Sequence, residues 1–319
     1  MNKKLLSSLL LLTLLATACG SEEPIAEVEE KLVITTSLYP VYFFTSEIVQ
    51  DKADVVNLTP GGVEPHDYEL TPHDIERMQD SNLLVVNGNL EPWVEDMESP
   101  LQEKGVSVIV LTEDMDLLEG TSEHEEEHEG EEGHEEEEEH QDEVAKDPHV
   151  WLDPLLAYEM VEHLTRELAI LDPENAEFYE ANADTLKNKL LILNEDYMAA
   201  LTSCQQSTFV TSHAAFAYLA NRYNLTQLPI SGLSPDIEPS LVEVAKIVDF
   251  VKENNVKVIF FESLISPKLS ETIAEEVGAE TLVLNPIEGL TSADVTAGKD
   301  YFSEMEQNLA NLKIALECQ

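Results

Sequence analysis

Basic residues are scarce in this chain of 319 residues. Lysine and arginine together number 17, against 65 aspartates and glutamates, so the formal net charge at neutral pH is −48. A protein this acidic repels phosphate backbones and anionic membrane surfaces, which argues against nucleic acid as a partner. Metal cations are the natural counterparts of so many carboxylates.

Long apolar runs are also few, and the main one stands at the start of the chain. The stretch "MNKKLLSSLLLLTLLATAC" places two lysines before the leucine-rich run and small residues directly before Cys19. This layout is typical of a secretory signal, and the small residues before a cysteine resemble a bacterial lipobox. We therefore expect residues 1–19 to form a lipoprotein signal peptide with a lipidated Cys19, followed by a flexible acidic tether over residues 20–31. The alternative is an ordinary cleaved signal.

No second apolar stretch approaches the ~20 residues that a membrane-spanning helix needs. The lipid would then be the only anchor, which places the protein outside the cytoplasm on the cell membrane.

Cysteine is rare as well, with three in the whole chain. Once Cys19 is assigned to the lipid, Cys204 and Cys318 remain, and an even pair outside the cytoplasm suggests one disulfide. Closing a loop of more than a hundred residues stabilises the folded state by up to roughly 5 kcal/mol on the chain-entropy model. Two free thiols are the alternative, because the sequence does not give the distance between the two Cα atoms.

Short runs rich in valine, isoleucine and leucine alternate with helix-length segments through the chain. They cover residues 31–37, 54–59, 82–88, 106–112, 208–213, 225–231, 256–263 and 280–285. Continuous apolar runs separated in this way are typical of parallel strands buried on both faces. The pattern predicts an α/β protein with two lobes, over residues 32–171 and 204–319. Each lobe would be a small parallel sheet of about four strands covered by helices.

The segment between the lobes, residues 172–203, contains no glycine and no proline after Pro173. Asp172 as N-cap and Pro173 at the first helical position would start a helix well. Apolar residues then recur at helical spacing. One rigid linker helix of about 30 residues, or about 45 Å, is expected to join the lobes.

Four candidate metal ligands follow predicted strands. His66 lies in "TPGGVEPHDYEL" after the second strand, His149 in "DPHVWLDP" after the fourth, His213 in "VTSHAAFAYLA" after the fifth and Glu288 in "LNPIEGLT" after the eighth. In open α/β sheets, ligands bind at the carboxyl ends of the strands. Two candidates from each lobe are therefore expected to meet in the cleft between the lobes, although any one of them alone could be an ordinary loop residue.

Three imidazoles and one carboxylate are a suitable donor set for tetrahedral zinc, whereas manganese or calcium would be expected to have more oxygen ligands. Glu262, Asp67 or Asp153 could accept a hydrogen bond from a ligand histidine and fix its tautomer. Each of the three could equally be a carboxylate at a strand end or a helix cap. Trp151 could exclude water from the site or be a core aromatic.

The motifs "GGVEPHDYEL", "DPHVWLDP", "VTSHAAFAYLA" and "NPIEGLTSADVTAGKDYF", with a His/Glu-rich run before the second, occur together in this order. From about residue 31 to the C-terminus, the chain resembles the zinc-binding lipoproteins of bacterial ABC zinc-uptake systems, which belong to the metal-specific class of solute-binding proteins called cluster A-I. The resemblance implies that His66, His149 and His213 coordinate the metal and that Glu288 completes the shell. Some members use water, or an acidic residue that would correspond to Glu64, as the fourth ligand.

Manganese-binding relatives use an aspartate near the position of Asn285. The amide in this chain therefore disfavours Mn²⁺ and leaves Zn²⁺ as the expected ligand.

The resemblance also implies a function. The protein would capture zinc outside the membrane, hold it between two lobes and deliver it to an ABC permease driven by a cytoplasmic ATPase, with the binding protein itself expected to be a monomer. A zinc hydrolase is the rival hypothesis. The chain has no H-E-x-x-H motif, and a fourth protein ligand would close the position that metal-activated water needs. A third hypothesis, an adhesin, has no sequence feature of its own.

Residues 121–143 contain 14 acidic residues and four histidines, His124, His128, His134 and His140, and no apolar residue. A segment of this composition is expected to be disordered. Without a scaffold, its histidines should bind more than one zinc ion weakly and exchangeably. The alternative is a solvated acidic linker with no role in metal binding.

Overall fold

The computed structural model describes residues 31–120, 145–235, 237 and 239–319. The predicted signal peptide with Cys19, the tether up to residue 30, and the acidic segment 121–143 with its four histidines lie outside the described residues. The structural account therefore concerns the two predicted lobes and the helix between them.

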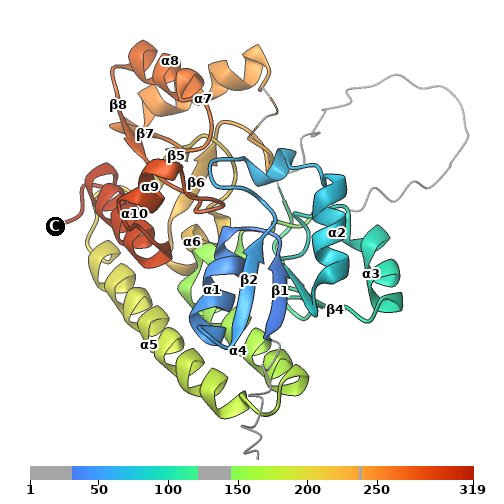
Figure 1. The fold of residues 1–319 in the computed structure, drawn as a ribbon. Helices are drawn as coiled ribbons and strands as arrows, with labels where there is room; N and C mark the ends of the chain where they lie inside the picture. Colours follow the sequence, from blue (N-terminus) through green and yellow to red (C-terminus); the bar gives the residue numbers. More distant parts are fainter. Residues whose placement is uncertain (1–30, 121–144, 236, 238) are drawn as a thin grey trace, which may run out of the picture. The chain divides into compact units, whose positions relative to one another are not determined.

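Two parallel four-stranded sheets form the two lobes, as the sequence predicts (Figure 1). The first sheet has the order β2-β1-β3-β4, and the second repeats it as β6-β5-β7-β8. The strands are β1 (Leu32–Thr36), β2 (Ala53–Asn57), β3 (Leu83–Val86), β4 (Ser107–Val110), β5 (Thr208–Thr211), β6 (Thr226–Pro229), β7 (Val258–Phe261) and β8 (Glu280–Val283). All eight predicted strands are present.

Helices cover both faces of each sheet. The first lobe contains α1 (Tyr39–Val49), α2 (Pro72–Asp80), α3 (Val94–Glu103) and α4 (Pro154–Leu171), with 3-10 turns η1 (Pro65–Asp67) and η2 (Val150–Leu152). Next come α5 (Ala176–Leu201), α6 (Ala217–Arg222), α7 (Leu241–Glu253), α8 (Lys268–Val277), α9 (Ser292–Thr296) and α10 (Tyr301–Ala315). The central strands of both sheets are therefore buried on two sides, which explains their continuous apolar runs.

Alternate side chains of each strand enter different cores. In β3, Leu83 and Val85 belong to a central cluster, while Leu84 packs with residues of α2 and α3. In the second sheet, Phe209 belongs to the same central cluster, while Val210 packs against residues of α7 and α8. The inner faces of the two sheets thus share one continuous core, which also includes residues of α1, α4, α5 and α10.

The linker helix α5 has 26 residues and is about 39 Å long. It passes alongside both lobes (Figure 1). Near its start, Asn182 Nδ2 donates to Ile48 O of α1, and near its end, the Tyr197 hydroxyl donates to Met305 O of α10. The helix is therefore fastened to both lobes.

The predicted start of this helix was wrong. Asp172 is the C-cap of α4, and its carboxylate accepts hydrogen bonds from Asn175 Nδ2 at 2.7 Å and the Tyr179 hydroxyl at 2.6 Å. The N-cap of α5 is Asn175. An Asp-Pro pair can end one helix as well as begin another, since Pro173 cannot continue α4.

The C-terminus returns to the start of the second lobe. Cys204 and Cys318 form the predicted disulfide, with their Cα atoms 3.8 Å apart. Gln319 N donates to Ser203 O, and Gln205 N donates to Leu316 O. The end of α10 is therefore tied to the end of α5.

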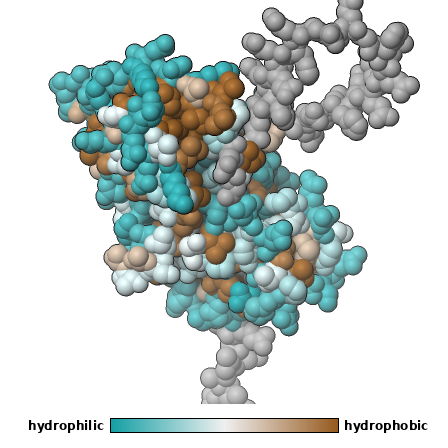
Figure 2. Space-filling model, turned by 90° about the horizontal axis from the view of Figure 1, so that it is seen from above, coloured by the Kyte–Doolittle hydropathy of each residue, from teal (hydrophilic) through white to brown (hydrophobic). Residues whose placement is uncertain are grey.

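Figure 2 shows apolar patches separated by hydrophilic surface on one face of the molecule. The exposed large apolar residues include Ile237, Leu241 and Val242, at or just before the first turn of α7. Leu241 is 88% exposed, so these side chains add surface rather than core. Among the residues that the structure describes, no helix is both long enough and apolar enough to cross a membrane.

Candidate metal centre

His66 is delivered by the loop that follows β2. Gly61 approaches the second lobe so closely that a Cβ there would lie 3.2 Å from Leu290 O, and Gly62 adopts a φ of +83°. Pro65 then starts η1, and the Glu64 carboxylate accepts a hydrogen bond from His66 N at 3.3 Å. The two glycines thus allow this loop to reach the turn that carries Glu288.

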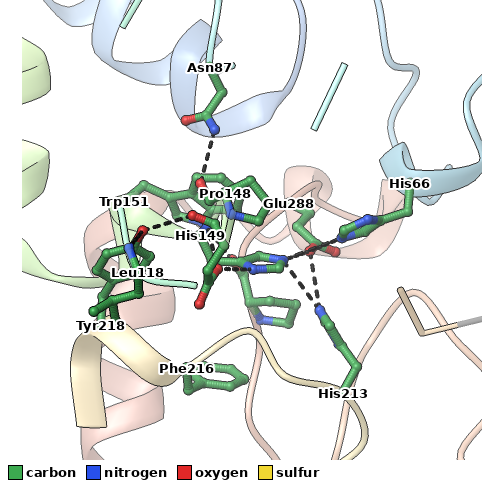
Figure 3. A network of polar contacts seen from close by, with 12 residues as sticks. His66, Asn87, Leu118, Pro148, His149, Trp151, His213, Phe216, Tyr218 and Glu288 are labelled. Carbon is green, nitrogen blue, oxygen red and sulfur yellow. Dashed lines mark hydrogen bonds and ion pairs between the residues drawn. The ribbon is translucent and has the colours of Figure 1, made fainter. Parts of the chain in front are cut away.

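His149 is the N-cap of η2 and is fully buried. Its Nδ1 and its backbone N both contact Asp147 Oδ1, at 2.8 Å and 2.9 Å. The Asp147 backbone is held in turn, because the Tyr218 hydroxyl donates to Asp147 O and accepts from Leu118 N (Figure 3). Asp147 therefore fixes the orientation of the His149 ring. Tyr218, which belongs to the other lobe, holds the backbone of Asp147.

His213 lies two residues beyond the end of β5 and is also fully buried. Its Nδ1 lies 2.7 Å from Glu262 Oε1, and its backbone N donates to the same oxygen. Glu262 directly follows β7, the strand next to β5. The geometry repeats that of His149, with a carboxylate behind the imidazole.

Glu288 lies in the turn after β8 and is fully buried. Trp151 Nε1 donates to Pro286 O at 2.7 Å. The centroids of the Trp151 and His149 rings lie 5.3 Å apart. Trp151 therefore lines the site and also ties η2 to the Glu288 turn.

The three histidines converge on the Glu288 carboxylate (Figure 3). One ligand atom from each of His66, His149, His213 and Glu288 lies within 4.8 Å of the others. From His149 Nε2, the distances are 3.3 Å to His66 Nε2, 3.4 Å to His213 Nε2 and 3.0 Å to Glu288 Oε1. From Glu288 Oε1, they are 3.2 Å to His66 Nε2 and 3.6 Å to His213 Nε2.

These distances match the edges of a tetrahedron around zinc. Ligand bonds of 2.0–2.1 Å give edges of about 3.3–3.4 Å. Five of the six edges lie between 3.0 and 3.6 Å. The donor set of three imidazoles and one carboxylate fits zinc.

The hydrogen bonds imply which nitrogens face the metal. When Asp147 and Glu262 accept from Nδ1–H of His149 and His213, each Nε2 presents a lone pair to the centre. Lone pairs that face one another in a buried space need a cation or protons between them. The cluster is thus preorganised for a positive ion.

Protonation in the metal-free protein follows the same electrostatics. Burial disfavours the charged form of His213, but the charge of Glu262 and hydrogen bonds with Glu262 and Glu288 raise its pKa well above the usual value. The pKa of His149 is also raised, because hydrogen bonds with Asp147 and Glu288 outweigh the effect of burial. For Glu288, burial is outweighed by hydrogen bonds with the three histidines, which hold its pKa well below the ordinary range.

Glu64, the alternative fourth ligand, has a different environment. Burial, and then the charge of Glu288, raise the pKa of Glu64 to about 9. A carboxyl group with this pKa is protonated near neutral pH in the metal-free protein, so zinc would have to displace its proton to bind there. Its Oε1 already accepts from His66 N.

The predictions for supporting residues had mixed outcomes. Glu262 accepts from a ligand histidine, as expected. Asp153 instead caps α4 and binds Arg222. Among the described residues, Asp67 forms no hydrogen bond with any of the three histidines. The sequence reasoning missed Asp147, although its place two residues before His149 in "DPHVWLDP" was a usable signal.

The side chain of Asn285 does not face the cluster. Its Nδ2 donates to Glu304 Oε2, and its Oδ1 accepts from Ile287 N. The preference for zinc therefore rests on the three histidines and the glutamate.

Comparison with known proteins agrees with this geometry. Residues 34–315 match the family model ZnuA, described as zinc-uptake complex component A, periplasmic. The chain belongs to this family. The resemblance seen in the sequence is thereby confirmed. Proteins of this family are solute-binding components of transport systems and not enzymes. The zinc-hydrolase hypothesis is therefore set aside.

Individual relatives are similar over most of the chain. A Bacillus subtilis protein named high-affinity zinc uptake system protein ZnuA is 44% identical over 95% of this chain and 94% of its own length. The zinc-binding lipoprotein AdcA of Streptococcus pneumoniae is 42% identical over 96% of this chain, which spans only 60% of AdcA. A crystal structure is known of the Zn(II)-bound ZnuA-like domain of Streptococcus pneumoniae AdcA. Its sequence is 39% identical to this chain, and the two structures superpose with a TM-score of 0.76, covering 90% of this chain and all of that domain.

Proposed function

We propose that this protein is an extracytoplasmic zinc-binding protein that captures Zn²⁺ between its two lobes and delivers it to a membrane permease for uptake. One observation carries the proposal: four ligand atoms from four separate segments of the chain meet, with five of their six distances at the spacing of a zinc tetrahedron. The family and the zinc-bound relative support it.

The proposed ligands are His66, His149, His213 and Glu288. Glu288 is preferred over Glu64 as the fourth ligand, since its oxygen lies 3.0–3.6 Å from all three imidazole nitrogens and its depressed pKa keeps it ionised. With all four bonds supplied by the protein, the centre holds zinc as cargo rather than activating water.

The ligand assignment is tested by competition titration of metal-free protein with Zn²⁺ and Mn²⁺ against a chelator. Wild-type protein should bind one zinc tightly and prefer it to manganese. His66→Ala, His149→Ala and His213→Ala should each weaken zinc binding strongly, and Glu288→Ala should weaken it less. Unchanged zinc affinity in any histidine variant would remove that residue from the site.

The proposed domain organisation follows the sequence. The signal peptide would be removed up to residue 18, Cys19 would become the lipidated N-terminus, and the tether to residue 31 would connect it to lobes 32–171 and 204–319. Mass spectrometry of the membrane-bound protein should find a lipid on Cys19. Cys19→Ala should release the protein from the membrane fraction without changing zinc affinity.

The proposed partners are an ABC permease and its cytoplasmic ATPase, with the binding protein acting as a monomer. The family description, a component of a zinc-uptake complex, supports a membrane partner. Cells that lack this chain should take up less zinc when zinc is scarce, and wild-type protein, unlike His149→Ala, should restore uptake. Equal restoration by His149→Ala would contradict the delivery role.

A further inference from the structure

The turn that carries Glu288 has a strained backbone. Ile287, the residue before Glu288, has a φ of 61° and is fully buried. A β-branched residue rarely adopts this left-handed conformation, which is strained and persists only when neighbouring groups enforce it. Something outside the turn must therefore hold Glu288 in place.

Asn285 and α10 provide that restraint. Asn285 Oδ1 accepts from Ile287 N at 2.9 Å and so closes the turn. Asn308 brackets Asn285, because its Oδ1 accepts from Asn285 N and its Nδ2 donates to Asn285 O. Glu304, one helical turn before Asn308, accepts from Asn285 Nδ2 at 2.8 Å. The amide of Asn285 can therefore close the turn only in the orientation that Glu304 selects.

Glu304 is itself held from the surface. It is 4% exposed, and its Oε1 lies 2.9 Å from Lys299 Nζ. Lys299 also contacts Asp294 Oδ1 at 2.8 Å. One carboxylate oxygen of Glu304 thus faces an ammonium group and the other accepts from an amide. A continuous chain of polar contacts thus runs from Lys299 through Glu304 and Asn285 to the Glu288 turn.

We propose that Glu304 is a positioning residue for zinc binding, which holds the strained turn through Asn285 so that Glu288 meets the three imidazoles. This inference rests on the proposed zinc-binding function and extends it to a residue that does not touch the metal. Glu304 acts only through Glu288, so its loss cannot weaken binding more than the loss of Glu288.

Two substitutions separate positioning from simple packing. Glu304→Leu removes the acceptor for Asn285 Nδ2 and should weaken zinc binding about tenfold, at the low end of what loss of a ligand's hydrogen-bonded support costs. Glu304→Gln keeps an acceptor oxygen and should retain most of the affinity. Glu306→Leu, on the exposed side of the same helix, is the matched control and should bind zinc like wild type.

The decisive test is a double-mutant cycle in which the zinc affinity of Glu304→Leu is measured with Glu288 present and with Glu288→Ala. The tenfold loss should vanish in the Glu288→Ala background. If Glu304→Leu does not fold, as judged by circular dichroism and Tm, Asn285→Ala replaces it in the same cycle, with the same expected loss.

A tenfold loss that persists without Glu288, or no loss in the single variant, would overturn the inference while leaving the proposed function intact. Failure of wild-type and Glu306→Leu proteins to bind zinc tightly would instead refute the proposed function, and the inference with it.

Discussion

At the residue scale, two of the four proposed ligands depend on a carboxylate that never touches the metal. Asp147 lies behind His149, and Glu262 lies behind His213, each within 2.8 Å of the ring Nδ1. A carboxylate in this position fixes the tautomer and raises the basicity of the coordinating nitrogen. The affinity of the site should therefore respond to residues outside the metal shell.

Asp147→Ala is predicted to weaken zinc binding about 10- to 100-fold, because His149 loses both hydrogen bonds that orient it. Competition titration measures the effect, and Asp67→Ala is the control, since Asp67 is the aspartate next to a ligand histidine in η1. Equal affinities in the two variants would contradict the assigned role of Asp147.

The pKa shifts predict how stability depends on pH. The raised pKa values of His149 and His213 stabilise the metal-free protein below about pH 6.5, and this contribution is lost as pH rises through the folded values. The depressed pKa of Glu288 adds stability above about pH 4.5 that is lost as pH falls towards its folded value. For His149, His213 and Glu288 taken together, the contribution to metal-free stability is therefore greatest between about pH 4.5 and 6.5.

Zinc must displace the protons on these imidazoles. The rise in Tm on adding zinc should therefore grow as pH increases from about 5 to 8. Thermal unfolding with and without zinc measures it. An increment that stays constant across this range would show that the ligands are not the titrating histidines.

The sequence predicted the residues that meet at the site better than the contacts between them. His66, His149, His213 and Glu288 follow strands, and the strand-end rule brings them together without coordinates. The direction of a side chain is set by tertiary packing, which no local pattern encodes. Asp147 was therefore missed, and Asn285 faces Glu304 rather than the cluster.

At the scale of elements, the two ends of the acidic segment are joined by a short antiparallel ladder. Gly120 N donates to Ala145 O at 2.7 Å, and Asp147 N donates to Leu118 O at 3.0 Å. Glu119 and Lys146 pair across it. These contacts hold the backbone that leads into His149.

Replacing residues 121–143 by Asn-Gly should therefore leave a folded protein with one tight zinc site and remove weaker extra equivalents. Zinc titration by calorimetry measures both classes of site. A replacement of equal length made of glycine and serine is the control, and it should also lose the weak sites. Loss of the tight site in both variants would show that the segment supplies a ligand.

Element types were predictable because the central strands are short, continuous and largely apolar, as strands buried on both faces must be. The residues at which helices begin and end were less predictable. The start of α5 was misplaced because Asp172 is bonded to Asn175 and Tyr179, and the cap assignment depends on those contacts.

At the scale of the whole molecule, the two lobes share a core and are cross-linked by hydrogen bonds around the site. The Tyr301 hydroxyl donates to Trp151 O, and Arg222 binds Asp153 through Nε and a terminal nitrogen, both at 2.7 Å. Wide separation of the lobes would expose apolar core and break these bonds together. Zinc release is therefore expected to involve local movement of ligand loops.

Small-angle scattering tests this directly on the intact mature protein. The radius of gyration should be the same within error with and without zinc. A clear increase on zinc removal would contradict the shared core and indicate a hinge between the lobes.

The central claim is that the protein itself supplies all four ligands of one zinc ion. A crystal structure of the zinc-loaded protein, with anomalous data collected at the zinc edge, tests it most directly. The account predicts one strong peak bonded at about 2.0–2.2 Å to Nε2 of His66, His149 and His213 and to an oxygen of Glu288, with no bound water. A peak elsewhere, or a water or Glu64 in place of Glu288, would contradict it.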